Sequence, residues 1–195
     1  MILNSIKVYD GADIHSRFAY KFLRDAVNPL GDIIIFRGPM NVTTNLIDQE
    51  DLLNNDYIYS DDAINIIWEI PNLCPLGAVA FQRLFNTHIG QVLSVNYLKK
   101  PIEINGDDLL IIDKFVGSDG KEHEKGKCSV SITISKDNVA LGHTGININA
   151  GRNAPGFAYS THLDDAQIED FCKNIQSMFY GMLQDFFIAT TKVIS

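Results

Sequence analysis

The sequence is short of cysteine and of long apolar runs. Its 195 residues include only Cys74, Cys128 and Cys172, which are widely spaced and never form a Cys-x-x-Cys pair. This spacing disfavours a zinc knuckle or a disulfide framework, so we expect reduced, buried thiols and no metal site. No run approaches 18 apolar residues, and the N-terminal residues lack a signal-peptide pattern. The sequence therefore predicts a cytoplasmic protein without a membrane span.

Basic residues are also scarce, with 16 Lys and Arg against 24 Asp and Glu and a formal net charge of −8. A nucleic-acid binder needs a basic face to neutralise phosphates, so this class is disfavoured. Hydrophobic residues make up 46% and charged residues 21%, which is typical of a globular protein. The length favours a single domain over residues 1–195.

Apolar periodicity predicts an α+β fold in which helices back a mixed, largely antiparallel sheet. We expect strands over 32–37, 63–70, 101–113, 127–134 and 139–149, helices over 13–27, 75–94 and 164–191, and a loop over 114–126. The last helix carries more apolar residues than one contact stripe needs. This surplus indicates a subunit interface or a well-covered sheet. We expect a homo-oligomer, a dimer formed through this helix or through a sheet edge.

Polar residues alternate along two neighbouring predicted strands and define one candidate face. Its members are Lys127, Ser129, Ser131 and Thr133 on the first strand and His143, Gly145, Asn147 and Asn149 on the second. If residues 135–138 form the turn, Lys127 lies opposite or diagonal to Asn147, and Ser131 lies near His143. The face either meets water, as in many antiparallel sheets, or forms the floor of a ligand pocket.

The chemistry of these residues leaves several roles open. Lys127 suits a carboxylate or a phosphate. Asp107 and Asp108 could bind a metal, orient Lys127, fix an amine or simply cap a turn. His143 is a candidate general base or ligand, or a polar residue at a strand end. Arg83 forms a salt bridge or reaches the pocket. We take Lys127, Asp107 and His143 as the candidate catalytic residues.

Three segments in this order resemble biotin and lipoate protein ligases: Asn-Gly-Asp-Asp-Leu at 105–109, Lys127, and Gly-Ile-Asn-Ile-Asn at 145–149. Residues 33–42, which include Arg37, Gly38 and Asn41, are similar to the lipoate-ligase strand that precedes an acidic helix start. The resemblance implies a core like that of class II aminoacyl-tRNA synthetases, with the sheet as the floor of an acyl-adenylate site.

By the same resemblance, Lys127 would contact the acyl carboxylate and the phosphate. Asp107 or Asp108 would lie near the amine or a metal, Arg37 at the pocket rim and Asn147 on the floor. ATP and magnesium are implied as cofactors only in this way.

The whole chain also resembles the uncharacterised family called domain of unknown function three-six-six. The shared segments are Arg37-Gly38, Ser60-Asp61, Gln82-Arg83-Leu84, Gly106-Asp107-Asp108, 127–132 and 145–148. Asp61 and Arg83 join the candidate ligand-binding residues on this basis.

Two departures from the ligase pattern bear on the activity. The stretch 56–65, which corresponds to the glycine-triplet loop of lipoate ligases, contains no glycine. No cysteine occurs between Cys128 and Cys172, where the related octanoyltransferases carry their nucleophile. We therefore expect a small-molecule pocket on the polar sheet face, which takes a carboxylate or an acyl group and is ligase- or acyltransferase-like if catalytic. A non-catalytic small-molecule-binding protein and a structural homo-oligomer are the alternatives.

Overall fold

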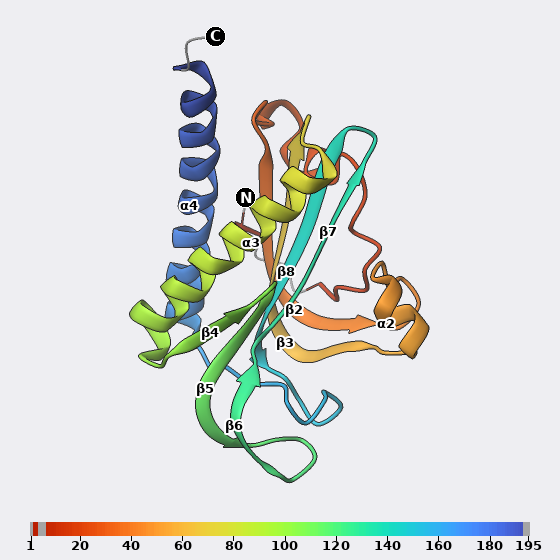
Figure 1. The fold of residues 1–195 in the computed structure, drawn as a ribbon, viewed down its shortest axis with the longest axis vertical. Coiled ribbons are helices and arrows are strands. Elements are labelled where there is room, and N and C mark those ends of the chain that lie inside the picture. The colour runs from red at the N-terminus through yellow and green to blue at the C-terminus, as the bar shows by residue number, and fades with distance from the viewer. Residues whose placement is uncertain (1, 4–6, 193–195) are drawn as a thin grey trace.

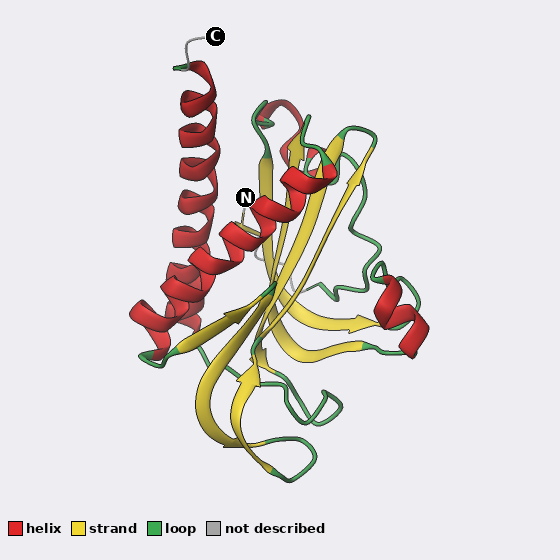
Figure 2. Ribbon diagram, viewed as in Figure 1, coloured by secondary structure: helices red, strands yellow, loops and turns green. Residues whose placement is uncertain are grey.

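The computed structural model describes residues 2–3 and 7–192 (Figures 1 and 2). The strands are β1 (Ile2–Leu3), β2 (Asp32–Val42), β3 (Ile58–Pro71), β4 (Ile102–Asn105), β5 (Asp108–Val116), β6 (Glu122–Lys127), β7 (Ser129–Lys136) and β8 (Val139–Asn149). The helices are α1 (Tyr20–Leu23), the 3-10 helix η1 (Arg24–Ala26), α2 (Gln49–Asn54), α3 (Pro75–Val92), the π-helix η2 (Leu93–Leu98) and α4 (Asp165–Thr191).

The strands form two sheets. The larger has the order β1-β2-β3-β8-β7, in which β1 and β2 are parallel and the other neighbours antiparallel. The smaller sheet, β4-β5-β6, is antiparallel. The expected α+β fold with a mixed, largely antiparallel sheet is thus confirmed.

The larger sheet is covered on both faces, which explains its long apolar strands. Helices α3 and α4 cover one face (Figure 1), where Phe85 and Phe179 pack in one cluster with Ile66. On the other face, Tyr9 and Phe18 from the N-terminal segment cluster with residues of β2 and β3. We call residues 9–23 the N-terminal cover.

Each longer helix begins at a recognisable cap. The Asp48 side chain accepts a hydrogen bond from the backbone N–H of Glu50 at the start of α2. The Cys74 sulfur accepts from the Gly77 N–H at the start of α3, and Pro75 follows at the first helical position. Cys74 is exposed in this capping position, so the expectation of buried thiols is wrong for this cysteine. At α4, Asp164 and Gln167 form a capping box. Within residues 2–3 and 7–192, no helix is long and apolar enough to cross a membrane.

The predicted helix over 13–27 is wrong. Only α1 and η1 are helical there, because Arg17 and Arg24 adopt positive φ values of 64° and 47° that interrupt a right-handed helix. Ile14 and Phe18 have helical spacing, yet they lie in turns whose apolar side chains are buried against the sheet. Tertiary packing here outweighs the local pattern.

The predicted loop over 114–126 is also wrong. Strand β5 continues to Val116, and β6 begins at Glu122, with a turn between them in which Gly120 has φ +74°. The predicted strand over 127–134 is interrupted at Cys128. Lys127 therefore ends β6 of the smaller sheet, and β7 of the larger sheet begins only at Ser129.

The register of β7 and β8 corrects the predicted polar face. Ser131 lies opposite Thr144, and Ile132 lies opposite His143. Because side chains alternate between faces, a shift of one residue moves every side chain to the other side. Ser131 therefore faces α3, where Gln82 donates to its hydroxyl at 2.9 Å, whereas His143 stacks on Tyr9 of the N-terminal cover.

Apolar side chains at the end of α4 remain accessible to solvent. Phe187 is 52% exposed and Ile188 is 47% exposed. The dimer expected from this helix stays a prediction.

Candidate functional site

A cavity of about 430 Å³ lies where the two sheets meet the segment 155–158, and we call it the Lys127 cavity. Backbone hydrogen bonds fix Lys127 at its edge. The Lys127 N–H donates to the Phe157 carbonyl, and the Tyr159 N–H donates to the Lys127 carbonyl, both at 2.9 Å. The Lys127 ammonium forms an ion pair with Asp108 at 2.7 Å. Its side chain is 30% exposed and borders the cavity.

Asn147 supplies a second polar group to this cavity. Its backbone is held by Cys128 and Thr161, since its N–H donates to the Cys128 carbonyl and its carbonyl accepts from both donors of Thr161. Asn147 is only 3% exposed, and its Oδ1 has no hydrogen-bond partner among the described residues. An unsatisfied buried amide oxygen is costly, so a ligand donor at this point would be favourable.

The other walls combine acidic and apolar side chains. Asp51 and Asp56 border the cavity, as do Ile58, Val130 and Phe157. Burial raises the pKa of Asp51, the charges of Asp48 and Asp56 raise it further, and the positive charge of Lys127 lowers it. The cavity therefore presents one ammonium and one amide beside apolar surface, with carboxylates at its margin.

His143 lies outside this cavity and borders a neighbouring void of about 40 Å³. Its ring stacks on Tyr9 with centroids 3.6 Å apart, and its Nε2 donates to Oδ1 of Asn65 at 3.0 Å. Asn65 in turn donates to the Gly38 carbonyl at 3.1 Å. Burial lowers the pKa of His143 to about 3, so the imidazole is neutral at pH 7.

The buried imidazole predicts a pH-dependent stability. The unfolded chain takes up a proton below about pH 6.5, whereas folded His143 does not, so stability falls as the pH drops from about 6.5 towards 3. Between pH 7 and pH 5 this residue should cost about 2 kcal/mol. Urea unfolding of wild type and His143→Gln at both pH values measures the cost, which should be absent in the variant. Equal losses in the two proteins would contradict this reading.

Other predicted site residues serve structural contacts. Arg83 pairs with Asp107 at 2.5 Å, and Arg37 pairs with Asp62 at 2.6 Å and with Asp165 at 2.7 Å. These pairs tie α3 to the β4–β5 turn and the larger sheet to the start of α4. Neither arginine borders the Lys127 cavity.

The two predicted glycines are sites of close packing. A Cβ at Gly38 would lie 1.9 Å from the Lys7 carbonyl oxygen, and one at Gly145 would lie 2.3 Å from the Met40 sulfur. Gly38 thus admits the chain that leads into the N-terminal cover, and Gly145 admits a buried side chain on the same face.

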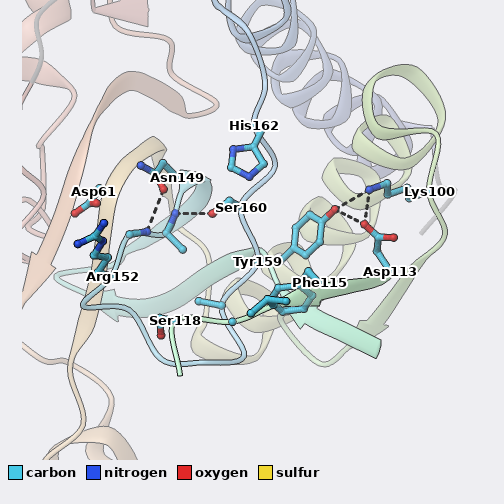
Figure 3. A pocket seen from close by; sticks show the side chains of 15 residues that line it. Asp61, Lys100, Asp113, Phe115, Ser118, Asn149, Arg152, Tyr159, Ser160 and His162 are labelled. Carbon is cyan, nitrogen blue, oxygen red and sulfur yellow. Dashed lines mark hydrogen bonds and ion pairs between the residues drawn. The ribbon is translucent and has the colours of Figure 1, made fainter. Parts of the chain in front are cut away.

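The remaining predicted residues are spread around the site. Ser129 borders the Lys127 cavity, but its hydroxyl accepts from the Leu109 N–H at 2.9 Å. Asn41 is exposed and pairs with Tyr59 on β3. Asp61 and Asn149 border a second, larger cavity (Figure 3). The structure therefore brings Lys127, Asp108 and Asn147 together and leaves Asp107 and His143 apart from them.

Sequence reasoning missed Asp51, Tyr57 and Phe157 as cavity residues. Phe157 is 52% exposed within a segment rich in glycine, asparagine and proline. An aromatic residue in such a polar segment was the available signal. Asp51 offered no comparable signal, because it looks like an ordinary acidic residue in the first turn of a helix.

Comparison with solved structures defines the class of fold. The chain is similar to the structure titled "Protein of Unknown Function from Pyrococcus horikoshi", with a TM-score of 0.81 and 23% identity over 100% of this chain and 97% of that one. It is also similar to P. falciparum LipL1 in complex with lipoate, with a TM-score of 0.51 and 14% identity over 84% of this chain. The chain spans about half of LipL1, 53% of its length.

A biotin acetyl coenzyme A carboxylase synthetase from Helicobacter pylori gives a TM-score of 0.45 and 12% identity, over 93% of this chain and 78% of that one. No protein with a curated description matches the chain. The expected biotin/lipoate-ligase-like fold is confirmed. Within this class, the sequence model of the protein family "Domain of unknown function (DUF366)" matches residues 1–194, and the chain belongs to that family.

Proposed function

We propose that this protein binds a small molecule with a carboxylate or acyl group in the Lys127 cavity. The observation that carries the proposal is the buried Oδ1 of Asn147, which has no partner among the described residues of a cavity that Lys127 also borders. A ligand could supply the missing donor to Asn147 and place an anionic oxygen beside the ammonium.

The pairing of Lys127 with Asp108 is compatible with this role. An ammonium has three N–H donors, and Asp108 needs only one of them. Asp108 would act as a positioning residue that holds the ammonium at the cavity edge. The carboxylates of Asp51 and Asp56 disfavour a highly charged anion, whereas the apolar wall suits a hydrocarbon chain. A volume of about 430 Å³ is sufficient for such a ligand.

The ligase-like fold supports acyl activation with ATP as the reaction of such a site, but fold alone does not define chemistry. One observation favours binding without adenylation. Residues 58–65 are not a glycine-rich loop but part of β3, paired with β2 and β8 along most of this stretch. A ligase-like enzyme and a non-catalytic binding protein are therefore the two candidate functions of this cavity.

A thermal-shift screen tests the binding proposal. The panel contains biotin, lipoate, octanoate and other small carboxylates, each with and without ATP and Mg²⁺. A ligand present at about 100 times its Kd should stabilise the protein by about 2.7 kcal/mol. Lys127→Ala should abolish this shift with little change in its own Tm, because Lys127 is partly exposed.

Lys125→Ala is the matched control. Lys125 lies on the same strand and forms an exposed ion pair with Glu103 at 3.1 Å, outside the cavity. The control should keep the ligand-induced shift. A shift that survives Lys127→Ala, or a screen without any hit, would contradict the proposal. If a ligand binds in a way that depends on Lys127, an assay of pyrophosphate release with this ligand, ATP and Mg²⁺ distinguishes the two candidate functions. Release would indicate a ligase-like enzyme, and binding without release would indicate a non-catalytic binding protein.

A further inference from the structure

A second cavity of about 610 Å³ lies on the other side of Ala158, which borders both cavities. The two cavities follow the same sheet face. On β8, Asn147 borders the first and Asn149 the second, and on β3, Tyr59 borders the first and Asp61 the second. Residues two apart on a strand point to the same side. The second cavity is thus lined by the same ends of β3 and β8 as the Lys127 cavity, but by different charged side chains.

One side of this cavity carries Asp61 and Arg152 (Figure 3). The Tyr59 hydroxyl donates to Oδ1 of Asp61 at 2.7 Å. Gly151 has φ +83°, and a Cβ there would lie 2.2 Å from Oδ2 of Asp61, so only glycine leaves room for this carboxylate. Within residues 2–3 and 7–192, neither Asp61 nor Arg152 forms an ion pair.

The other side carries charges that already neutralise each other (Figure 3). Lys100 pairs with Asp113, the Tyr159 hydroxyl donates to Asp113 at 2.8 Å, and Lys100 donates to that hydroxyl at 2.9 Å. The hydrogen bonds and the positive charge of Lys100 lower the pKa of Asp113, which keeps this carboxylate ionised. Among the described Asp, Lys and Arg side chains that line this cavity, Asp61 and Arg152 are therefore the two without an ion-pair partner; His162 also borders it.

We propose that the second cavity binds a small zwitterion of the amino-acid type, whose ammonium pairs with Asp61 and whose carboxylate pairs with Arg152. A simple anion would pair with Arg152 but would be repelled by the nearby Asp61 carboxylate. A simple amine would pair with Asp61 but would be repelled by the Arg152 guanidinium. A ligand with both charges satisfies both side chains. This inference does not depend on the function proposed for the Lys127 cavity.

The test is calorimetric titration of the whole protein with the twenty common amino acids at up to about 10 mM. For the tightest binder, the amine without its carboxylate and the acid without its amino group are titrated as matched arms. The amino acid should bind at least about tenfold more tightly than either arm. Equal binding of the acid arm would show an anion site instead, and no binding by any amino acid would overturn the proposal.

Variants assign the binding to these side chains. Arg152→Gln and Asp61→Asn should each weaken binding at least about tenfold, whereas Lys173→Gln, on the exposed face of α4, should leave it unchanged. Lys127→Ala should also leave it unchanged, which separates this result from the test of the Lys127 cavity. Arg152 is exposed and without an ion pair among the described residues, so its variant folds even if Asp61→Asn does not. Unchanged binding in Arg152→Gln would overturn the proposal.

Discussion

Replacement of Phe85 by alanine is expected to lower the free energy of unfolding by about 3–5 kcal/mol. Phe85 is 0% exposed and lies at the centre of the contact between α3, α4 and the larger sheet. Its ring centroid is 5.6 Å from that of Phe81 and 5.7 Å from that of Phe179. The loss combines the transfer free energy of the aromatic ring with the cost of the cavity that two helices and a sheet leave unfilled.

Urea unfolding of wild type and Phe85→Ala at constant pH measures this loss. Phe187→Ala is the matched control, since Phe187 on α4 is 52% exposed and its removal should change stability by less than about 1 kcal/mol. A loss at Phe85 that is no larger than the loss at Phe187 would contradict the described core.

The second large effect is expected at Asn86, which connects α3 to two other elements. Its Nδ2 donates to the Asp107 carbonyl at 3.1 Å, and its Oδ1 accepts from the Thr144 hydroxyl at 2.9 Å. Asn86→Leu keeps the number of side-chain heavy atoms but removes the hydrogen bonds to the half-buried Asp107 and to the buried Thr144. Each unsatisfied buried group costs about 1–3 kcal/mol, which gives about 2–6 kcal/mol for two such groups. Because Asp107 is half-buried and Thr144 keeps its contact with the Ser131 hydroxyl, we expect the lower part of this range, a loss of about 2–4 kcal/mol.

The same change should loosen the turn that carries Asp107 and Asp108. Hydrogen exchange should therefore become faster at the Leu109 N–H, which bonds to the Ser129 hydroxyl beside this turn. Asn174→Leu, an exposed change on α4, is the control and should shift stability by no more than about 0.5 kcal/mol. A loss at Asn86 as small as this would show that the buried polar contacts carry little energy.

The sequence predicted the kinds of elements better than the pairing between them. Alternation along 127–134 and 143–149 correctly indicated strands. The expectation that Ser131 and His143 share one face was wrong, because the two side chains lie on opposite faces of the sheet. Periodicity assigns a side chain to one of two faces, and only the register relates the faces of two strands. The two-residue turn at Asp137 and Asn138, both with positive φ, sets this register, since Lys136 pairs with Val139 and Ser131 then lies opposite Thr144.

The candidate site was predicted in part. Lys127 and Asn147 were expected to lie close together, and they border one cavity, but Lys127 reaches it from the end of β6 rather than from the start of β7. The unpartnered Oδ1 of Asn147 could not be foreseen, because the burial of this side chain depends on long-range packing, in which the Asn147 backbone bonds to Cys128 and Thr161. The roles of these residues stay predictions.

The most direct test of the central claim is a thermodynamic cycle between Lys127 and the ligand's carboxylate. Calorimetry would compare the best carboxylate from the screen with its neutral amide, in wild type and in Lys127→Met. If the ammonium pairs with the carboxylate, the amide should bind about 10–100-fold more weakly to wild type, and this preference should vanish in the variant. An equal preference for the carboxylate in both proteins would contradict a ligand-binding role for Lys127.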